Sequence, residues 1–350
     1  MGTSDQINKL SLEYRFFLVD DRPYCLWGSN IQRQTLEFLN GWETKYFDHI
    51  AKTNISSALS TRYKRKAQLS SLTIRMAYSQ ALETLFALIA ASIQAPQCIP
   101  AWMAMYKNKD LDNIVNKIHH RQLLTSLLKQ VSPNWNDISD AVHLSLILEN
   151  KEKEANIRTG FGKLWSRFAS DYLNKDFLAE YNSIKHGLRV HSSGFYIALG
   201  KENRPGIHAP KENMQVMGKS EYGSTFWVAN KYKERNHHLQ LKPHHRNWNP
   251  EDFAWGIHLI SLSITNIISS LKILNGIHPS KVKFEWPSEF SAFEEPWSRT
   301  RKIGVTSMSG FSTHIPEDLI NLFSKEEIFE KYRKGEDAGV REIILSDQDK

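Results

Sequence analysis

The chain has 350 residues, of which 41% are hydrophobic, and it carries a formal net charge of +7. This is ample apolar material for one large domain or two modest ones. Only Cys25 and Cys98 are present, which argues against a disulfide framework or a thiolate metal site and fits a reducing compartment. Residues Met1–Leu18 lack the pattern of a signal or transit peptide, so a cytoplasmic protein is expected. No cofactor is expected, because the chain has neither a Gly-x-Gly-x-x-Gly motif nor a complete phosphate loop.

The first part of the chain reads as a mixed N-terminal segment, 1–60, followed by a helical bundle, 61–192. In the mixed segment a strand, a turn and an amphipathic stretch are expected at Phe16–Val19, Asp21–Pro23 and Ile31–Ile50. The first bundle helix is predicted over Leu69–Ile93, where apolar residues recur on one helical face before Pro96. Further helices are expected at Leu111–Val131, Asp137–Asn150, Lys163–Leu173 and Phe177–Leu188.

After residue 192 the pattern changes to a β insertion, 193–248, and then returns to helix. Runs of β-branched and aromatic residues predict strands at Phe195–Leu199, Thr225–Val228 and His238–Leu241. A helix completes the bundle over 249–276, with Asn249 as N-cap, Pro250 at the first helical position and Gly276 after the end. The C-terminal extension, 277–350, is expected to contain a strand and a short helix, at Lys281–Trp286 and near Glu317–Arg333. The predicted fold class is mainly α: a helical bundle with a small antiparallel β insertion and an irregular C-terminal region (α+β).

One stretch of the last bundle helix raises the question of a membrane span. Phe253–Leu271 contains no Lys, Arg, Asp or Glu, and about twenty apolar residues are enough to cross a bilayer. Its serines, however, lie mostly off an apolar stripe that steps by four and three residues, as in an amphipathic core helix. We therefore expect a buried helix and no membrane partner.

Two familiar chemical signatures can be rejected on spacing. Gly160–Lys163 looks like the end of a phosphate loop, but no glycine begins the loop, and Leu164 replaces the residue that would hold magnesium. The histidines between residues 237 and 245 fit no established metal spacing, because neighbouring residues on a strand point to opposite faces. No metal site is therefore expected.

Basic residues cluster between Arg235 and Trp248, which permits contact with a polyanion. The candidate nucleic-acid-binding residues of this region are Arg235, His237, His244 and Arg246. Shorter basic runs occur at Arg62–Lys66 and Arg299–Lys302. The alternative for each run is a solvated loop or face, where charge runs commonly lie.

A second polar cluster lies in Tyr181–Arg189. On a helix, an apolar stripe faces the core, and the polar residues fall on a neighbouring and opposite face. The apolar stripe consists of Phe177, Tyr181, Ile184 and Leu188, and the polar residues are Asn182, Lys185, His186 and Arg189. Alternatively, Gly187 ends the helix, which leaves His186 in the last turn and sends Arg189 into a loop.

These residue types suit metal-independent cleavage of RNA. A neutral histidine, here His186, can take a proton from a ribose 2′-hydroxyl, and cationic groups such as Lys185 and Arg189 can stabilise the charge on the phosphate. Asn182 could orient the ring or the substrate. The alternative is an exposed polar helical face that ends at a glycine, which many surface helices show.

At these residues the sequence resembles the HEPN superfamily of compact helical bundles. Nuclease members carry an arginine followed about one helical turn later by a histidine, often with a polar residue directly after the arginine. Asn182 and His186 match the polar residue and the histidine, whereas Tyr181 stands where the arginine is expected. The resemblance covers Leu69–Arg189 and Asn249–Asn275, but not the β insertion or the termini.

The resemblance implies an RNA-binding homodimer, and an endoribonuclease of a toxin or antiphage defence system if the protein is an enzyme. The alternative is a non-catalytic dimeric adaptor or sensor that binds nucleic acid or a protein partner. One further pattern is compatible with this fold: Arg75, Ser79 and Glu83 step by fours in an otherwise apolar helix. A buried Glu83 would need a cationic partner such as Lys185, although an ordinary surface ion pair is the alternative.

Overall fold

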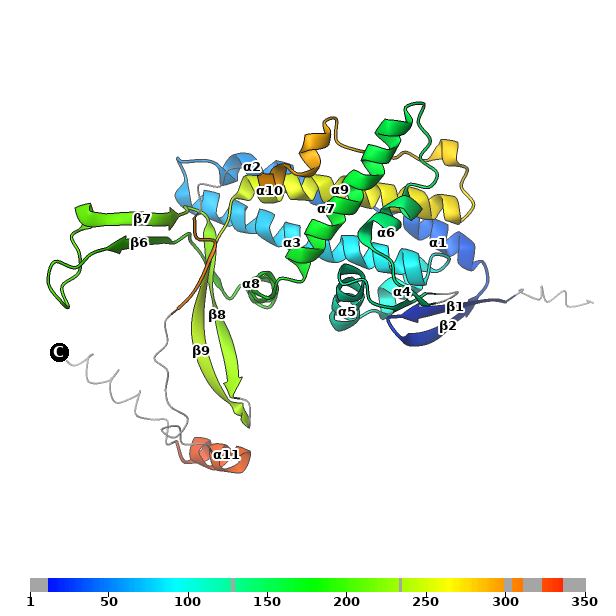
Figure 1. The fold of residues 1–350 in the computed structure, drawn as a ribbon. Coiled ribbons are helices and arrows are strands. Elements are labelled where there is room, and N and C mark those ends of the chain that lie inside the picture. The colour runs from blue at the N-terminus through cyan, green and yellow to red at the C-terminus, as the bar shows by residue number, and fades with distance from the viewer. Residues whose placement is uncertain (1–11, 127–129, 233–234, 299–303, 311–322, 336–350) are drawn as a thin grey trace, which may run out of the picture.

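The fold is that of a computed structural model, which describes residues 12–126, 130–232, 235–298, 304–310 and 323–335. Two long helices, α3 (Lys64–Gln94) and α9 (Pro250–Leu274), run side by side through the bundle (Figure 1). The helices α1 (Ile31–Asn40) and α2 (Tyr46–Ala58) pack against this pair, and α7 (Lys151–Tyr172) crosses it diagonally. The predicted class, mainly α with small antiparallel sheets, is confirmed.

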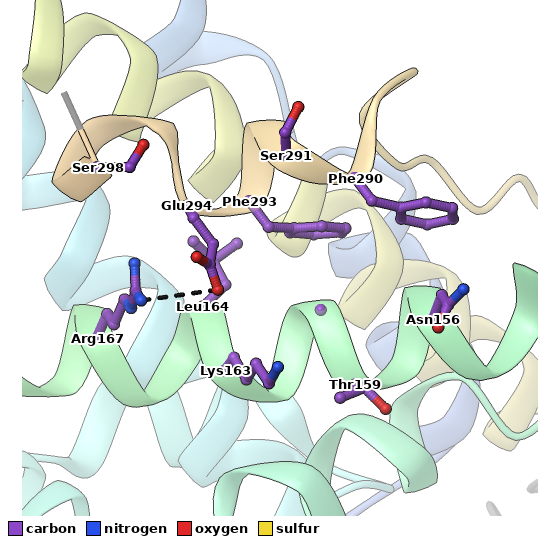
Figure 2. A pocket seen from close by; sticks show the side chains of 11 residues that line it. Asn156, Thr159, Lys163, Leu164, Arg167, Phe290, Ser291, Phe293, Glu294 and Ser298 are labelled. Atoms are coloured by element: carbon purple, nitrogen blue, oxygen red, sulfur yellow. Dashed lines mark ion pairs between the residues drawn. The ribbon is translucent and has the colours of Figure 1, made fainter.

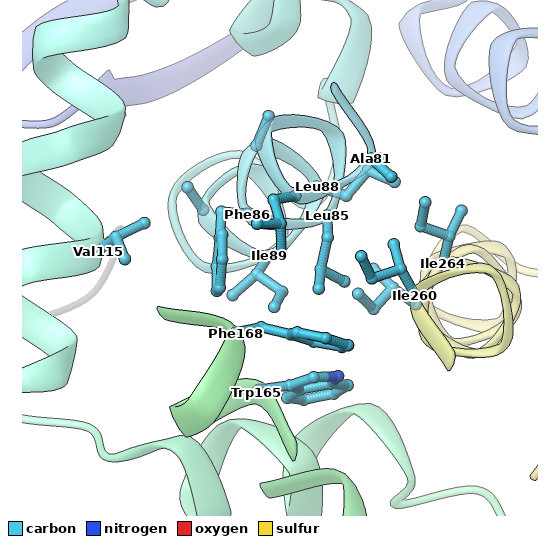
Figure 3. Packing of buried hydrophobic residues seen from close by; sticks show 14 of the residues in the cluster. Ala81, Leu85, Phe86, Leu88, Ile89, Val115, Trp165, Phe168, Ile260 and Ile264 are labelled. Carbon is cyan, nitrogen blue, oxygen red and sulfur yellow. The ribbon is translucent and has the colours of Figure 1, made fainter. Parts of the chain in front are cut away.

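The core lies where α3, α7 and α9 meet. Figure 3 shows Trp165 and Phe168 of α7 facing Phe86 of α3, with Ile260 of α9 beside them, and all four side chains are buried. The Trp165 indole donates to Ser263 Oγ at 3.0 Å, which satisfies its only polar group. Burial of this apolar surface is the main force that holds the three helices together.

Helix α9 begins and ends where the sequence predicts. The Asn249 side chain accepts from the backbone N–H of Glu251 at 3.0 Å, Pro250 is the first helical residue, and Gly276 follows the end with φ +98°. By length and composition, α3 and α9 could each cross a membrane. However, 61% and 67% of their most apolar stretches are buried inside the protein, and core helices of soluble proteins pass the same test.

The helix predicted over Leu111–Val131 is wrong in its second half. Helix α5 spans Asn108–His119, and the residues after it form a short hairpin. The strands of this hairpin are β3 (Leu124–Thr125) and β4 (Gln130–Val131). The side-chain amide of Gln94, from the end of α3, donates to the Thr125 carbonyl at 2.9 Å. The extended backbone at Thr125 is therefore bonded to a residue of α3, although the local sequence pattern favoured a helix here.

The other bundle elements agree with the predicted ones in place but differ in length. The predicted helix over Asp137–Asn150 stops early, because α6 ends at Val142. Asn134 caps α6 and accepts from the backbone N–H groups of Asn136 and Asp137. The remaining elements of this part are β1 (Glu13–Val19), β2 (Arg22–Gly28), α4 (Ile99–Met105), α6 (Trp135–Val142) and α8 (Lys175–Lys185).

The predicted antiparallel β insertion is present and carries a long ribbon. Strands β8 (Gly223–Tyr232) and β9 (Arg235–Asn247) pair along their length and project from the bundle (Figure 1). They lie inside a sheet of order β10-β9-β8-β5, whose edge strands are β5 (Val190–Ser192) and β10 (Ser307–Ser309). A separate hairpin is formed by β6 (Tyr196–Gly200) and β7 (Met214–Lys219).

The strand predicted at Lys281–Trp286 is wrong, because this stretch pairs with side chains of α9 and not with another strand. The Asn266 amide accepts from the Glu285 N–H at 2.7 Å and donates to its carbonyl at 2.8 Å. Ser269 Oγ donates to the Lys283 carbonyl at 2.7 Å. The insertion also contains η1 (Lys211–Asn213). Besides β10, the described part of the extension contains η2 (Pro279–Lys281), η3 (Phe290–Phe293), α10 (Glu295–Ser298) and α11 (Lys325–Lys334). The part of the predicted Glu317–Arg333 helix before residue 323 lies outside the described residues.

Candidate nucleic-acid interface

Helix α8 ends at Lys185, so the predicted alternative in which Gly187 stops the helix is the observed one. Gly187 has φ +101°, a left-handed conformation that favours glycine, and Leu188 also has a positive φ of 52°. The backbone N–H of Arg189 donates to the Ser183 carbonyl at 2.8 Å and closes the turn. The prediction that Leu188 belongs to the core stripe is wrong, since its side chain is 59% exposed.

Three of the four predicted catalytic residues come together at this turn. Lys185, His186 and Arg189 are all exposed, and we call them the basic turn. Within the described part of the chain, the side chains of His186 and Arg189 have no hydrogen-bond or ion-pair partner. The fourth residue, Asn182, is half-buried, and its backbone carbonyl, not its amide, accepts from the His186 N–H at 3.0 Å.

Tyr181, at the position where HEPN nucleases carry arginine, faces the bundle. It is buried, and its hydroxyl donates to Glu83 Oε2 at 3.1 Å. Burial, and then the nearby Glu83 carboxylate, raise the pKa of Tyr181 far above its usual value, so this position carries no charge at neutral pH. The predicted Glu83–Lys185 pair is long and partly exposed, with Nζ 4.0 Å from Oε2. It therefore corresponds to the surface ion pair and not to a buried one.

The buried ion pair of this region involves Glu180, a residue that sequence reasoning did not select. Both Glu180 and Arg75 are 0% exposed, and Arg75 Nε donates to Glu180 Oε2 at 2.9 Å. The other carboxylate oxygen accepts from Trp248 Nε1 at 2.9 Å and from the Ser224 hydroxyl. Ser79 Oγ accepts a further hydrogen bond, from Arg75 Nη1 at 2.6 Å. We call these five residues and Arg246 the Glu180 network.

Arg246, predicted to bind nucleic acid, is instead a buried member of this network. Its Nε lies 3.7 Å from Glu180 Oε2, its Nη1 lies 3.7 Å from Asp176 Oδ2, and its guanidinium stacks 4.2 Å from the Phe177 ring. Burial, more than its neighbouring charges, lowers the pKa of Arg246. The reason for the wrong prediction is the alternation of β9, which turns residue 246 toward α8 although the surrounding run is basic.

Of the other predicted nucleic-acid contacts on β9, only the His244 side chain lies within the described part of the chain, and its printed neighbours belong to the sheet. His244 is half-buried, stacks on Phe226 with ring centroids 5.8 Å apart, and lies 3.3 Å from Ser309 Oγ of β10. Arg235 and His237 stand at the outer end of β9, and their side chains lie outside the described residues. Among the side chains that the structure describes, no three of His, Cys, Asp or Glu gather as a metal site.

The network explains how the basic turn is held. Glu180 joins α8 to α3 through Arg75, to β8 through Ser224, and to β9 through Trp248. Phe177, one turn earlier, contacts both guanidiniums: Arg75 lies 4.7 Å and Arg246 lies 4.2 Å from its ring centroid. Because α8 is anchored at Phe177–Tyr181, the exposed residues that follow project from a rigid support.

No protein-family model, curated protein or solved structure matches this chain. The resemblance to HEPN proteins therefore rests on Asn182 and His186 within a helical bundle, and the function must be argued from the geometry of the site.

Proposed function

We propose that this chain is an RNA-binding protein that contacts the phosphate backbone through the basic turn. The observation that supports this most is the convergence of Lys185, His186 and Arg189 on one exposed turn. Two of these side chains lack a described partner and are available to a phosphate. Lys and Arg side chains in such positions supply the salt-dependent part of nucleic-acid affinity.

The same turn has groups suited to metal-independent cleavage, and we include this activity in the proposal. His186 would take the proton of a ribose 2′-hydroxyl, while Lys185 and Arg189 would stabilise the charge that develops on the phosphate. In the HEPN-like architecture a homodimer would bring two such turns together. HEPN nucleases carry an arginine at the position of Tyr181. Under this proposal Arg189 supplies that positive charge instead.

One observation favours the second candidate, a non-catalytic dimeric adaptor or sensor. Tyr181 is buried and bonded to Glu83, so the residue that precedes Asn182 offers no cation to a substrate. An adaptor would use the same basic turn for binding and would leave its RNA intact.

Binding is tested by fluorescence anisotropy with labelled single-stranded RNA over a range of salt concentrations. Lys185→Ala and Arg189→Ala should each weaken binding and reduce the slope of log K against log salt by about 0.7, the value for one phosphate contact on a single strand. Arg33→Ala is the matched control, because Arg33 is exposed on α1 and paired with Glu37. If the slopes of all variants equal that of the wild type, the basic turn does not bind RNA.

Cleavage is tested separately, with the same RNA in the presence of a metal chelator. If the wild-type protein cuts RNA and His186→Ala binds it without cutting, the enzyme proposal is supported. If the wild-type protein binds RNA but leaves it intact in every condition, the adaptor is favoured. Light scattering of the purified protein tests the homodimer.

A further inference from the structure

A cavity of about 540 Å³ lies far from the basic turn along the chain, between the middle of α7 and the segment that contains η3 and α10. This volume is within the range of small-ligand sites, roughly 300–1,000 Å³. Figure 2 shows the side chains of α7 on one side of the cavity and Phe290 and Phe293 on the other.

The aromatic side of the cavity is partly fixed and partly open. Phe293 is buried: it packs edge-on against Phe161 at 5.0 Å and lies over Gly160, where a Cβ would come within 2.6 Å of its ring. The Phe290 ring is nearly parallel to it, at an interplanar angle of 14°, but is 39% exposed. In Figure 2 the two rings lie side by side, so Phe290 offers a flat apolar surface beside a rigid neighbour.

The α7 side of the cavity carries a polar stripe whose two ends differ in charge. Its members step by three, four and four residues along one helical face: Asn156, Thr159, Lys163 and Arg167. The amide and the hydroxyl stand at the end near Phe290, and the two cations stand at the other end (Figure 2). No described residue pairs with Lys163. Arg167 Nη2 lies 3.7 Å from Glu294 Oε1, and the Arg167 guanidinium lies over the Trp297 ring, 5.4 Å from its centroid.

We propose that this cavity binds a nucleoside monophosphate, with the base on Phe290 and the phosphate at Lys163 and Arg167. The base would stack on the exposed ring and present its polar edge to Asn156 and Thr159. From Asn156 to Lys163 the helix rises by about 10 Å, which matches the length of a nucleoside monophosphate. The charged lining residues are Lys163, Arg167 and Glu294, so the cavity is net cationic and suits one phosphate group.

The proposal is tested by calorimetric titration of the full-length protein with the four 5′-monophosphates, their nucleosides and inorganic phosphate. At least one monophosphate should bind ten times more tightly than both its nucleoside and inorganic phosphate, because only the monophosphate uses both ends of the cavity. If none of the four binds more tightly than inorganic phosphate, the proposal is overturned.

Four variants assign the binding to this cavity. Lys163→Ala should weaken the monophosphate tenfold or more, as expected for loss of a charge-assisted contact of roughly 1.5–3 kcal/mol, whereas Lys151→Ala at the exposed start of α7 should not. Phe290→Leu should weaken the monophosphate but not inorganic phosphate. Glu294→Gln should tighten binding severalfold by freeing Arg167. Affinity that is unchanged in both Lys163→Ala and Phe290→Leu overturns the proposal.

A final comparison separates this site from the RNA proposal. Lys185→Ala, which changes the basic turn, should leave monophosphate binding unchanged. If instead Lys163→Ala weakens binding of a 5′-phosphorylated RNA and leaves monophosphate binding intact, the cavity serves the polymer and the monophosphate site is refuted.

Discussion

Removing the charge of Glu180 while keeping its shape, by Glu180→Gln, should destabilise the protein strongly. Its carboxylate lies 2.9 Å from Arg75 Nε and 3.7 Å from Arg246 Nε, and both glutamate and Arg75 are fully buried. At an effective dielectric constant of about 20, unit charges 2.9 Å apart attract by roughly 6 kcal/mol before desolvation is subtracted. Breaking one side of a buried pair costs about 3–5 kcal/mol net, because the remaining charge stays in the core.

The free energy of unfolding should therefore fall by about 3–5 kcal/mol in a urea titration, a large part of the 5–15 kcal/mol typical of a folded protein. Tryptophan fluorescence is a suitable signal, because Trp248 Nε1 donates directly to Glu180. In a double-mutant cycle, Arg75→Met combined with Glu180→Gln should cost less than the sum of the two single changes.

The matched control is Glu37→Gln, which neutralises one partner of the exposed Arg33–Glu37 pair on α1 and should leave the urea midpoint unchanged. The reasoning is refuted if Glu180→Gln lowers the free energy of unfolding by less than about 1 kcal/mol. It is also refuted if the effects of Arg75→Met and Glu180→Gln add up to that of the double variant, since a coupled buried pair gives neither result.

Three further changes probe other parts of the bundle. Burial lowers the pKa of His143 to about 4. The free energy of unfolding should therefore be constant above pH 6.5 in this respect and fall by roughly 3 kcal/mol as the pH drops toward 4, because only the unfolded state binds the proton in this range. His143→Gln should remove this part of the pH dependence in urea titrations. Burial alone would raise the pKa of Asp48. The hydrogen bonds from His258 and Lys52 outweigh this effect and lower the Asp48 pKa to about 2. Asp48→Asn should therefore reduce stability at pH 7 but not near pH 2, where wild type and variant should have similar urea midpoints. Gly162→Ala would place a Cβ 2.9 Å from the backbone of Asn136 and should cost about 1–3 kcal/mol by pushing α6 from α7, measured by thermal unfolding.

The parts of the fold that could be predicted are those with local signals. Helix α9 was placed within a residue at its start, because Asn249 and Pro250 act on the backbone beside them. The stretch after His119 was assigned wrongly, because its hairpin is accompanied by a hydrogen bond from Gln94, which no pattern near Thr125 reveals. The same holds for Lys281–Trp286, whose extended backbone is satisfied by side chains of α9.

The candidate site was predicted in part. Lys185, His186 and Arg189 lie within five positions of one another and are all exposed at the end of α8, and their role in binding or catalysis stays a prediction. Glu180 was missed because its partners, Arg75 and Arg246, are distant in sequence and close only in the fold. One signal was available: an arginine and a serine four residues apart on an apolar helix indicate a buried cation that needs a carboxylate.

The position of the Glu180 network determines how variants of the basic turn must be interpreted. The network holds α8 at Phe177–Tyr181, whereas the basic turn begins four residues later and is exposed. Glu180→Gln can therefore reduce RNA binding merely by loosening α8. Arg189→Ala removes the charge of an exposed side chain with no described partner, and Lys185→Ala removes only a partly exposed ammonium near Glu83 and the Tyr181 ring. Loss of RNA binding at unchanged urea midpoint identifies a contact with the polymer. If RNA binding and the urea midpoint fall together across variants, the changed residues only hold α8 in place. We expect Arg246→Ala to behave in this way, although Arg246 lies in the basic strand β9, because its side chain is buried in the Glu180 network.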